Sequence, residues 1–218
     1  MIENEKCVVV ISGGVDSSTV AFWAKNQGYH VHGLSFRYGQ IAAKEVDHAQ
    51  LITQQLGIPL KTLDLTVLKD IYVGVTSLCD ETIEMTSEFS QPIIVPFRNA
   101  IFLSIAVAYA ASIDATQIFY GAQGSDRPFY PDCRTEFYKA FETAARLGTK
   151  KEITIDAPFN TVSKAETIKR GAELGVPYQL TWSCYFDGAK HCGTCESCMN
   201  RKKAFEEAEI KDPTEYFD

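Results

Sequence analysis

The sequence predicts an α/β fold, in which helices cover both faces of a parallel sheet and a small metal-binding appendix follows. Strand-like and helix-like segments alternate along most of the chain, as they do when crossover helices join parallel strands. The first strand-like segment contains Val8, Val9 and Val10 in succession, which is typical of a strand buried on both faces. The alternation stops near Trp182, and most of the cysteines lie beyond it.

Glycine, proline and capping residues set the limits of the expected elements. The expected strands are residues 6–11, 29–36, 60–63, 117–121 and 152–155. The expected helices are residues 15–27, 43–56, 98–111, 135–147 before Gly148, a helix from the cap Ser163 to Gly175, and 196–207. Residues 74–91 form a polar stretch that is long for a loop, so we expect a lid or a substrate loop there.

The composition is that of an ordinary soluble globular protein. Of the 218 residues, 45% are hydrophobic and 22% are charged, which is enough for a core in one large domain. The formal net charge of −7 provides no basic field for nucleic acid or anionic lipid. The N-terminus lacks the features of a secretory signal, and the apolar run 100–111 is too short to span a bilayer. We therefore expect a cytoplasmic protein.

The loop after the first strand has the composition of a phosphate-binding turn. Its glycines allow a sharp turn and close approach to a ligand, and the next helix directs free N–H groups at an anion. The predicted binding residues are Ser12, Gly13, Gly14, Val15, Asp16, Ser17 and Ser18. Asp16 beside a phosphate needs an intervening cation, so we expect it to contact Mg²⁺. A Walker A loop and a dinucleotide fingerprint do not fit the string; a glycine-rich turn without a ligand is the simpler alternative.

Four cysteines near the C-terminus have the spacing of a metal site. Cys184, Cys192, Cys195 and Cys198 fall within fifteen residues. Thiolates this close would repel one another without a metal, and four of them match a closed, structural Zn²⁺ site. An Fe–S cluster is the main alternative, because Cys-x₂-Cys-x₂-Cys also occurs in ferredoxins, although no cysteine follows Cys198 here.

Residues 130–134 follow the fourth expected strand, at the carboxyl edge where such sheets bind ligands. Tyr130 can stack on a flat ring, Asp132 can accept two N–H bonds, and Arg134 can bind an anion. These groups suit a guanine-like heterocycle that carries a carboxylate. A turn with a helix cap at Asp132 is the alternative explanation.

Two further cationic side chains lack a structural explanation in the sequence. Arg98, followed by Asn99, opens an expected buried helix, where an arginine usually meets a charged group; a solvated helix end is the alternative. Ser163 and Glu166 form a capping box, which does not explain Lys164 between them. We expect Lys164 to neutralise charge on a reacting phosphate.

The Ser12–Ser18 loop resembles that of the ATP pyrophosphatase (PP-loop) superfamily, which cleaves ATP between the α and β phosphates. The chain as a whole resembles the 7-cyano-7-deazaguanine synthase family. The matching strings are Tyr38-Gly39-Gln40, Pro96-Phe97-Arg98-Asn99, Tyr130–Arg134, Ser163–Glu166 and the four-cysteine tail. This resemblance implies a Rossmann-like (adenine nucleotide alpha hydrolase-like) domain over residues 1–181 and a zinc-binding segment over 182–218.

That family uses ATP and ammonia to convert 7-carboxy-7-deazaguanine into the nitrile, a queuosine precursor. The resemblance implies ATP, Mg²⁺ and structural Zn²⁺ as ligands, a homodimer, and no direct contact with nucleic acid or membrane. It implies catalytic roles for Asp16, Lys164 and Arg98. It places ATP near Ser35, Phe36 and Arg37 as well as the loop, and the deazaguanine acid near Arg98, Asn99, Tyr130, Asp132 and Arg134.

The chain departs from the family pattern at residues 41–42 and 122–127, which border the expected pocket. A related enzyme that transfers the activated acid to another amine, even one on a protein, therefore stays open. An Fe–S PP-loop enzyme that thiolates tRNA and an ATP-binding sensor without turnover are further alternatives. The acidic composition argues against the first of these two, and the cysteine tail with Tyr130–Arg134 against the second.

Overall fold

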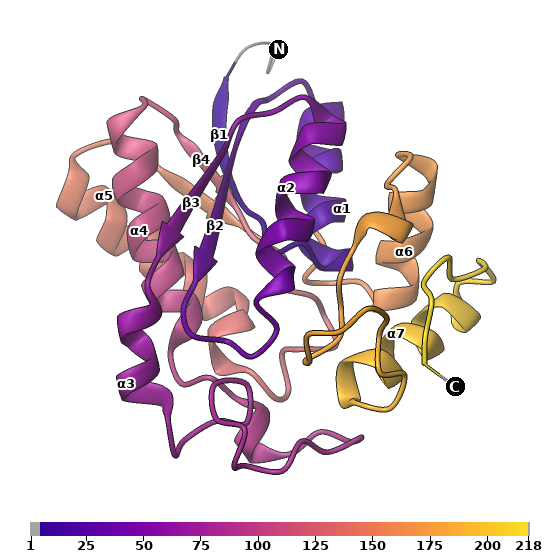
Figure 1. The fold of residues 1–218 in the computed structure, drawn as a ribbon. Helices are drawn as coiled ribbons and strands as arrows, with labels where there is room; N and C mark the ends of the chain where they lie inside the picture. Colours follow the sequence, from indigo (N-terminus) through magenta and orange to yellow (C-terminus); the bar gives the residue numbers. More distant parts are fainter. Residues whose placement is uncertain (1–4, 218) are drawn as a thin grey trace.

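The computed structural model describes residues 5–217 of the chain and has a five-stranded parallel sheet at its centre (Figure 1). The strands run in the order β3-β2-β1-β4-β5, and every pairing is parallel. They are β1 (Lys6–Val10), β2 (His30–Arg37), β3 (Leu60–Asp64), β4 (Gln117–Phe119) and β5 (Thr154–Asp156). The predicted fold class is confirmed.

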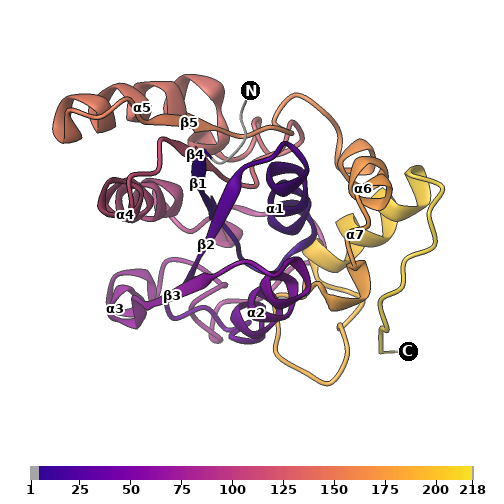
Figure 2. The same ribbon diagram turned by 90° about the horizontal axis from the view of Figure 1, so that it is seen from above.

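Helices cover the sheet on both faces (Figure 2). The helix α1 and its neighbour α2 pack on one face, while α4 and α5 pack on the other. The α-helices are α1 (Val15–Asn26), α2 (Lys44–Leu56), α3 (Lys69–Tyr72), α4 (Arg98–Ser112), α5 (Thr135–Thr149), α6 (Lys164–Glu173) and α7 (Glu196–Glu207). Short 3₁₀ turns are η1 (Thr66–Leu68), η2 (Gln91–Ile93), η3 (Pro131–Cys133) and η4 (Tyr178–Leu180).

The valine run of β1 is buried because both of its faces are covered. Val8 joins the core beneath α4 and α5, together with Leu103 and Ile155. Val9 points the other way and joins the core beneath α1 and α2. Successive side chains of a strand alternate between faces, so a central strand in a two-sided sheet must be apolar at every position.

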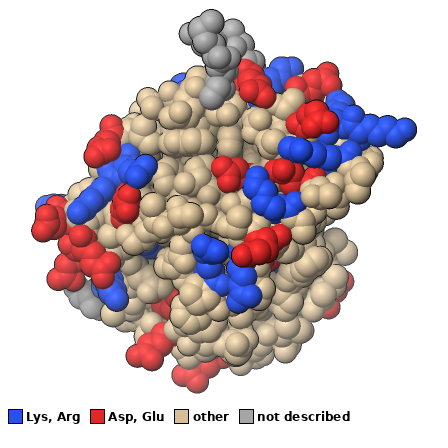
Figure 3. Space-filling model, turned by 180° about the vertical axis from the view of Figure 1, so that it is seen from behind, with Lys and Arg blue, Asp and Glu red and all other residues tan. Residues whose placement is uncertain are grey.

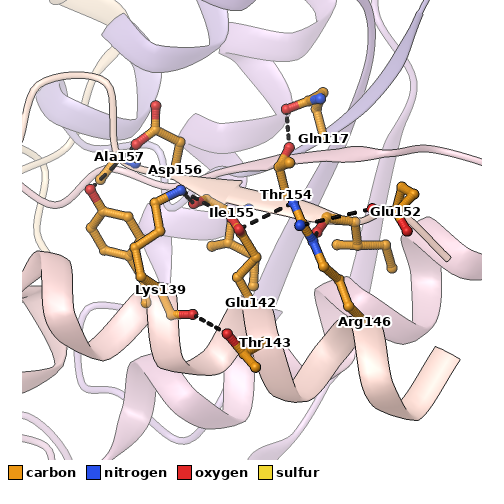
Figure 4. Close-up of polar contacts among 12 residues, drawn as sticks. Gln117, Lys139, Glu142, Thr143, Arg146, Glu152, Thr154, Ile155, Asp156 and Ala157 are labelled. Carbon is orange, nitrogen blue, oxygen red and sulfur yellow. Dashed lines mark hydrogen bonds and ion pairs between the residues drawn. The ribbon is translucent and has the colours of Figure 1, made fainter. Parts of the chain in front are cut away.

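The edge strand β5 is fixed to α5 by hydrogen bonds between side chains and backbone (Figure 4). The amide of Ile155 donates to the Glu142 carboxylate at 2.8 Å, and Lys139 donates to the Ile155 carbonyl at 3.1 Å. Arg146 donates to the Ile153 carbonyl at 2.7 Å. These contacts occupy backbone groups that an edge strand would otherwise expose.

Most element bounds lie within two residues of the prediction, and the structure differs in kind at the end of α5 and at α3. The helix α5 continues through Gly148, because the left-handed residue that ends it is Lys150, at φ 55°. The short α3 was not predicted, and residues 74–91 form an ordered loop with little regular structure. Cys79 in that loop is buried in a cluster with Tyr38, Tyr72 and Val95, so apolar packing ties the loop to the sheet.

The C-terminal segment is packed onto the main body. Ala204 and Phe205 of α7 share an apolar cluster with Val15 and Ile168. Arg201 is fully buried and pairs with Asp212 at 3.1 Å. These contacts bring the start of α7 close to the carboxyl ends of the strands, where the cavity described below lies.

The stretch Gln91–Ser112, which includes η2 and α4, is long and apolar enough to cross a membrane by length and composition alone. The core helix of a soluble protein meets the same criterion, and α4 packs against β1, β4 and α5. Figure 3 shows the back of the molecule, where basic side chains lie among acidic ones and form no continuous basic surface on that face.

Candidate active site

A cavity of about 290 Å³ lies at the carboxyl ends of β1, β2 and β4. This is where open α/β sheets bind ligands, and the volume suits a small-molecule site. Of the predicted site residues, those that line it are Ser12, Gly14, Asp16, Ser17, Phe36, Arg98, Asn99, Tyr130, Asp132 and Lys164. The fold therefore brings together segments that lie far apart in the sequence.

The remaining predicted site residues do not line this cavity; they are Gly13, Val15, Ser18, Ser35, Arg37 and Arg134. Gly13 lies in the turn and faces the backbone of α2, and Val15 is the first residue of α1. Ser18 and Ser35 are buried, and Arg37 lies at the surface, where it pairs with Asp47 at 3.1 Å. Arg134 lies in a separate open groove beside Arg127, to whose carbonyl it donates at 3.0 Å.

The turn from β1 to α1 is held in a shape that leaves helix amides free. The Ser12 amide donates to the Ser17 hydroxyl at 3.1 Å, and the two hydroxyls also lie 3.1 Å apart. Gly13 has a φ of +90°, and a Cβ there would lie 2.2 Å from the Glu45 carbonyl. Only glycine fits between the turn and α2. The first-turn amides of α1 lack partners within the helix and can bind an anion.

Asp16 and Lys164 meet at the mouth of this turn. The Lys164 Nζ lies 3.2 Å from Oδ2 of Asp16. The other oxygen, Oδ1, is buried and has no hydrogen-bond partner among the described residues. A hard carboxylate oxygen without such a partner, beside a turn that can bind an anion, fits a divalent cation. Burial lowers the pKa of Lys164, but Asp16 and Asp126 raise it more, so the ammonium stays charged.

Arg98 dominates the other end of the cavity. Its guanidinium donates to the Tyr38 hydroxyl at 2.8 Å and lies over the rings of Tyr38 and Phe102. Glu45 lines the cavity nearby, and burial raises the pKa of its carboxyl to about 7, although Arg98 lowers it. Asp132 accepts the Asn99 amide at 3.1 Å, so one of its oxygens caps α4 and is engaged in holding the fold.

Several cavity residues were given no role from the sequence. These are Glu45, Gln123, Asp126, Tyr185, Glu196 and Asn200. Gln123 and Asp126 lie in the stretch 122–127, which the sequence analysis placed at the border of the pocket only as a departure from the family pattern. Glu45 lies in a helix, and the last three lie in the cysteine-rich tail, which sequence reasoning treated only as a structural unit.

The tail forms one wall of the cavity. The Tyr185 hydroxyl donates to Glu196 at 2.7 Å, and Asn200 donates to the other oxygen of Glu196 at 2.5 Å. The Glu196 backbone amide donates to the Thr86 carbonyl at 3.1 Å. The tail and the 74–91 loop therefore meet over the site. Glu196 directly follows Cys195, so the cysteine cluster positions this wall.

The four predicted cysteine ligands converge. The sulfurs of Cys184, Cys192, Cys195 and Cys198 all lie within 4.8 Å of one another, and those of Cys192 and Cys198 are 3.9 Å apart. Four sulfurs about 2.3 Å from one ion would form a tetrahedron with edges of roughly 3.8 Å. A four-iron cluster needs room for eight atoms between its thiolates. The spacing fits a single ion.

Comparison with known proteins extends over nearly the whole chain. Residues 6–209 match the family described as "Queuosine biosynthesis protein QueC". The chain is 41% identical over 214 residues to 7-cyano-7-deazaguanine synthase of Caldicellulosiruptor bescii, with 97% of each chain covered. It is 43% identical over 226 residues to the same-named protein of Thermoplasma acidophilum, covering 99% of this chain and 93% of that one.

Solved structures share the fold at low identity. One is a 4-thiouridine synthetase in complex with RNA and ATP, with a TM-score of 0.55, 18% identity and 94% of this chain covered. This chain spans 50% of that chain's length. Another is the NH₃-dependent NAD synthetase of Campylobacter jejuni, with a TM-score of 0.54, 15% identity and coverage of 81% and 67%. On the match over residues 6–209 and the full-length relatives, the chain belongs to the queuosine biosynthesis QueC family, that of the 7-cyano-7-deazaguanine synthases.

Proposed function

We propose that this chain is an AMP-forming ATP-dependent ligase that converts 7-carboxy-7-deazaguanine and ammonia, through the amide, into 7-cyano-7-deazaguanine. The family match supports the product, since the relatives carry that name. The observation that carries the proposal is one cavity with the phosphate-binding turn and Lys164 at one end and the half-buried Arg98 at the other. Such a cavity offers donors for phosphates at one end and a cation for an anionic acid at the other.

The chemistry explains why ATP is needed. A carboxylate is a poor electrophile, because its leaving group would be oxide. Transfer of AMP to the carboxylate releases pyrophosphate and supplies a better leaving group. Ammonia then displaces AMP to give the amide. A second AMP transfer, to the amide oxygen, allows AMP to depart again and leaves the nitrile.

Different residues along the cavity would bind different parts of the two substrates. The turn amides and serine hydroxyls would hold the departing pyrophosphate, and Lys164 would stabilise charge on the α-phosphate. Arg98 would bind the substrate carboxylate, with Tyr130 against the flat ring. Asp16 would hold Mg²⁺, which neutralises phosphate charge when bound. None of these steps requires a covalent bond to the protein.

We further propose Zn²⁺ as the ion of the cysteine cluster. The sulfur spacing supports a single tetrahedral ion. With four protein ligands the ion has no open position, so its role would be structural. The tRNA-thiolating alternative needs an Fe–S cluster, and this spacing does not favour it. The departures at residues 41–42 and 122–127 left open a transfer of the activated acid to another amine, and the family match does not favour it.

The proposal places the reaction in the cytoplasm, with small-molecule substrates and no direct contact with nucleic acid or a membrane. A homodimer is the proposed assembly, as the family resemblance implies. Light scattering on the purified protein tests this part, and a mass of one chain would exclude the dimer.

The decisive test incubates the purified protein with Mg-ATP, ammonia and 7-carboxy-7-deazaguanine, followed by mass spectrometry. We expect the nitrile, AMP and pyrophosphate. Asp16→Ala should abolish pyrophosphate release while the metal content and the melting transition stay unchanged. An adduct on another amine would select the transferase alternative, and absence of AMP would exclude a ligase.

A further inference from the structure

The cavity contains a group of hydrogen-bond acceptors that the proposed binding of ATP and the deazaguanine acid does not use. Asp126 and Gln123 come from the loop after β4, and Glu196 comes from the start of α7. In the part of the chain that the structure describes, Asp126 Oδ2 accepts a single long hydrogen bond, from the backbone amide of Gln123 at 3.4 Å. Gln123 is 2% exposed, and its Oε1 has no partner anywhere in residues 5–217. The buried Gln123 oxygen therefore needs a donor that the protein does not supply.

Charge at this end of the cavity is unbalanced. Asp16, Asp126 and Glu196 are acidic, and Lys164 is the cation that faces them. Burial and the neighbouring Asp16 raise the pKa of Asp126 to about 6, and Lys164 opposes the shift. Lys164 already pairs with Asp16, and Glu196 is held by Tyr185 and Asn200. Among the described residues, Asp126 is thus the carboxylate of this group that has neither a cationic partner of its own nor a close hydrogen bond.

A ligand that binds between Asp126 and Gln123 must be small and cationic, and must carry hydrogen-bond donors but no acceptors. Ammonium meets these conditions, because it has four N–H donors and no acceptor. It is also the protonated form of the nitrogen substrate in the proposed reaction, and it cannot attack a carbon until it loses a proton. The site lies in the same cavity as Lys164, which we place at the α-phosphate.

We propose that Asp126 and Gln123 form the ammonium site of this enzyme, and that Asp126 accepts the proton that frees ammonia for attack. This inference rests on the proposed function. Ammonium passes one proton to an oxygen of Asp126. The nitrogen lone pair then forms a bond to the acyl carbon of the adenylate. The bond from that carbon to the AMP oxygen breaks, AMP leaves with the electron pair, and the nitrogen loses a second proton to water.

The test separates adenylation from amination in Asp126→Asn. Pyrophosphate exchange into ATP, measured with the acid and without ammonia, reports adenylation alone. We expect exchange to stay within about threefold of wild type, while kcat/KM for ammonium falls by about 10²- to 10⁴-fold. Hydroxylamine is largely unprotonated near neutral pH and needs no base, so hydroxamate formation should change little. Asp114→Asn, an exposed residue outside the cavity, is the matched control and should behave as wild type.

A second variant tests ammonium binding alone and keeps Asp126, the proposed proton acceptor. Gln123→Met keeps the size of the side chain and removes the acceptor, so the KM for ammonium should rise about tenfold with little change in kcat. Melting curves establish that both variants fold.

Three results would overturn the assignment. Equal losses with ammonium and hydroxylamine in Asp126→Asn would give the residue a role other than proton acceptance. Loss of exchange, or a higher Mg²⁺ requirement for it, would place Asp126 in the nucleotide site. Absence of acid-dependent exchange in the wild-type protein would remove the proposed function itself, and the ammonium site with it.

Discussion

Lys164 shows how one side chain takes its role from its surroundings. It opens α6 directly after the capping residue Ser163, whose hydroxyl accepts the Glu166 amide at 3.1 Å. The cap fixes the direction of the helix, and this direction brings the ammonium to Asp16. Its position at the phosphate-binding turn, rather than its place in the helix, suggests that it acts on the α-phosphate.

We expect Lys164→Ala to lower kcat for acid-dependent AMP formation by about 10²- to 10³-fold, with a smaller change in the KM for ATP, because charge on the phosphate develops mainly in the transition state. Steady-state assays of AMP release measure both constants. Lys169→Ala is the control, since Lys169 lies exposed on the same helix. A rise in KM at constant kcat would reduce Lys164 to a binding residue.

The raised pKa of Glu45, near Arg98 in the cavity, predicts that kcat/KM for the acid depends on pH. If the ionised carboxylate accepts N–H groups of the deazaguanine ring, kcat/KM for the acid should rise as pH increases through about 7, the raised pKa of this group. Glu45→Gln cannot ionise and should show a lower kcat/KM without this rise. A rise that persists in the variant would assign the titration to another group.

The Glu45 carboxyl also makes the free energy of unfolding depend on pH. Its pKa is raised from 4.5 to about 7 by burial, so the folded protein binds more protons than the unfolded chain between these values. The free energy of unfolding of wild type should therefore fall, relative to Glu45→Gln, as pH rises through that window. Urea denaturation at several pH values measures the difference.

Among the elements, the turn between β1 and α1 depends most on close packing. Gly13 and Gly28 both have a φ of +90°, but a Cβ at Gly13 would meet the backbone of α2, whereas nothing lies within 4 Å at Gly28. Both Gly→Ala variants carry the backbone strain, about 1–2 kcal/mol. The clash is confined to Gly13.

Gly13→Ala should therefore lose more stability than Gly28→Ala and should also lose pyrophosphate release, because α2 or the turn must shift. Gly28→Ala should remain active. Thermal melts and the exchange assay compare the two variants directly. Equal behaviour would mean that the contact between the turn and α2 yields without affecting the site.

At the scale of the whole molecule, the cysteine cluster couples stability to the active site. It fixes the tail that carries Tyr185, Glu196 and Asn200 into the cavity wall. Removal of the proposed ion would separate the thiolates and release that wall. The two apolar cores beside the sheet do not include the cysteines, so they would stay packed.

We expect Cys195→Ser to lose the ion, to lower the melting temperature by about 10 °C or more, and to abolish turnover. Elemental analysis should find one zinc per wild-type chain and no iron. Cys7→Ala, in β1, removes a buried thiol outside the cluster and should keep its zinc. Iron in the protein, with visible absorbance, would contradict the zinc assignment.

The sequence by itself determined the sheet, the order of its helices, the glycine turn between the first strand and the first helix, and the four cysteines that converge. Each of these depends on neighbours along the chain: an apolar run, glycines at one turn, thiols a few residues apart. The helix α7, Glu196–Glu207, was predicted with these bounds for the same reason.

The tertiary structure alone decided which side chains share the cavity. It brought in Glu45, Gln123, Asp126 and Glu196 and left Arg134 outside, because the path of the chain between elements sets these positions and no local pattern encodes it. Asp132 shows the same limit, since its bond to Asn99 spans 33 residues. Helices, strands and turns follow from residues close together in the sequence. The chemistry of the site follows from contacts between distant segments.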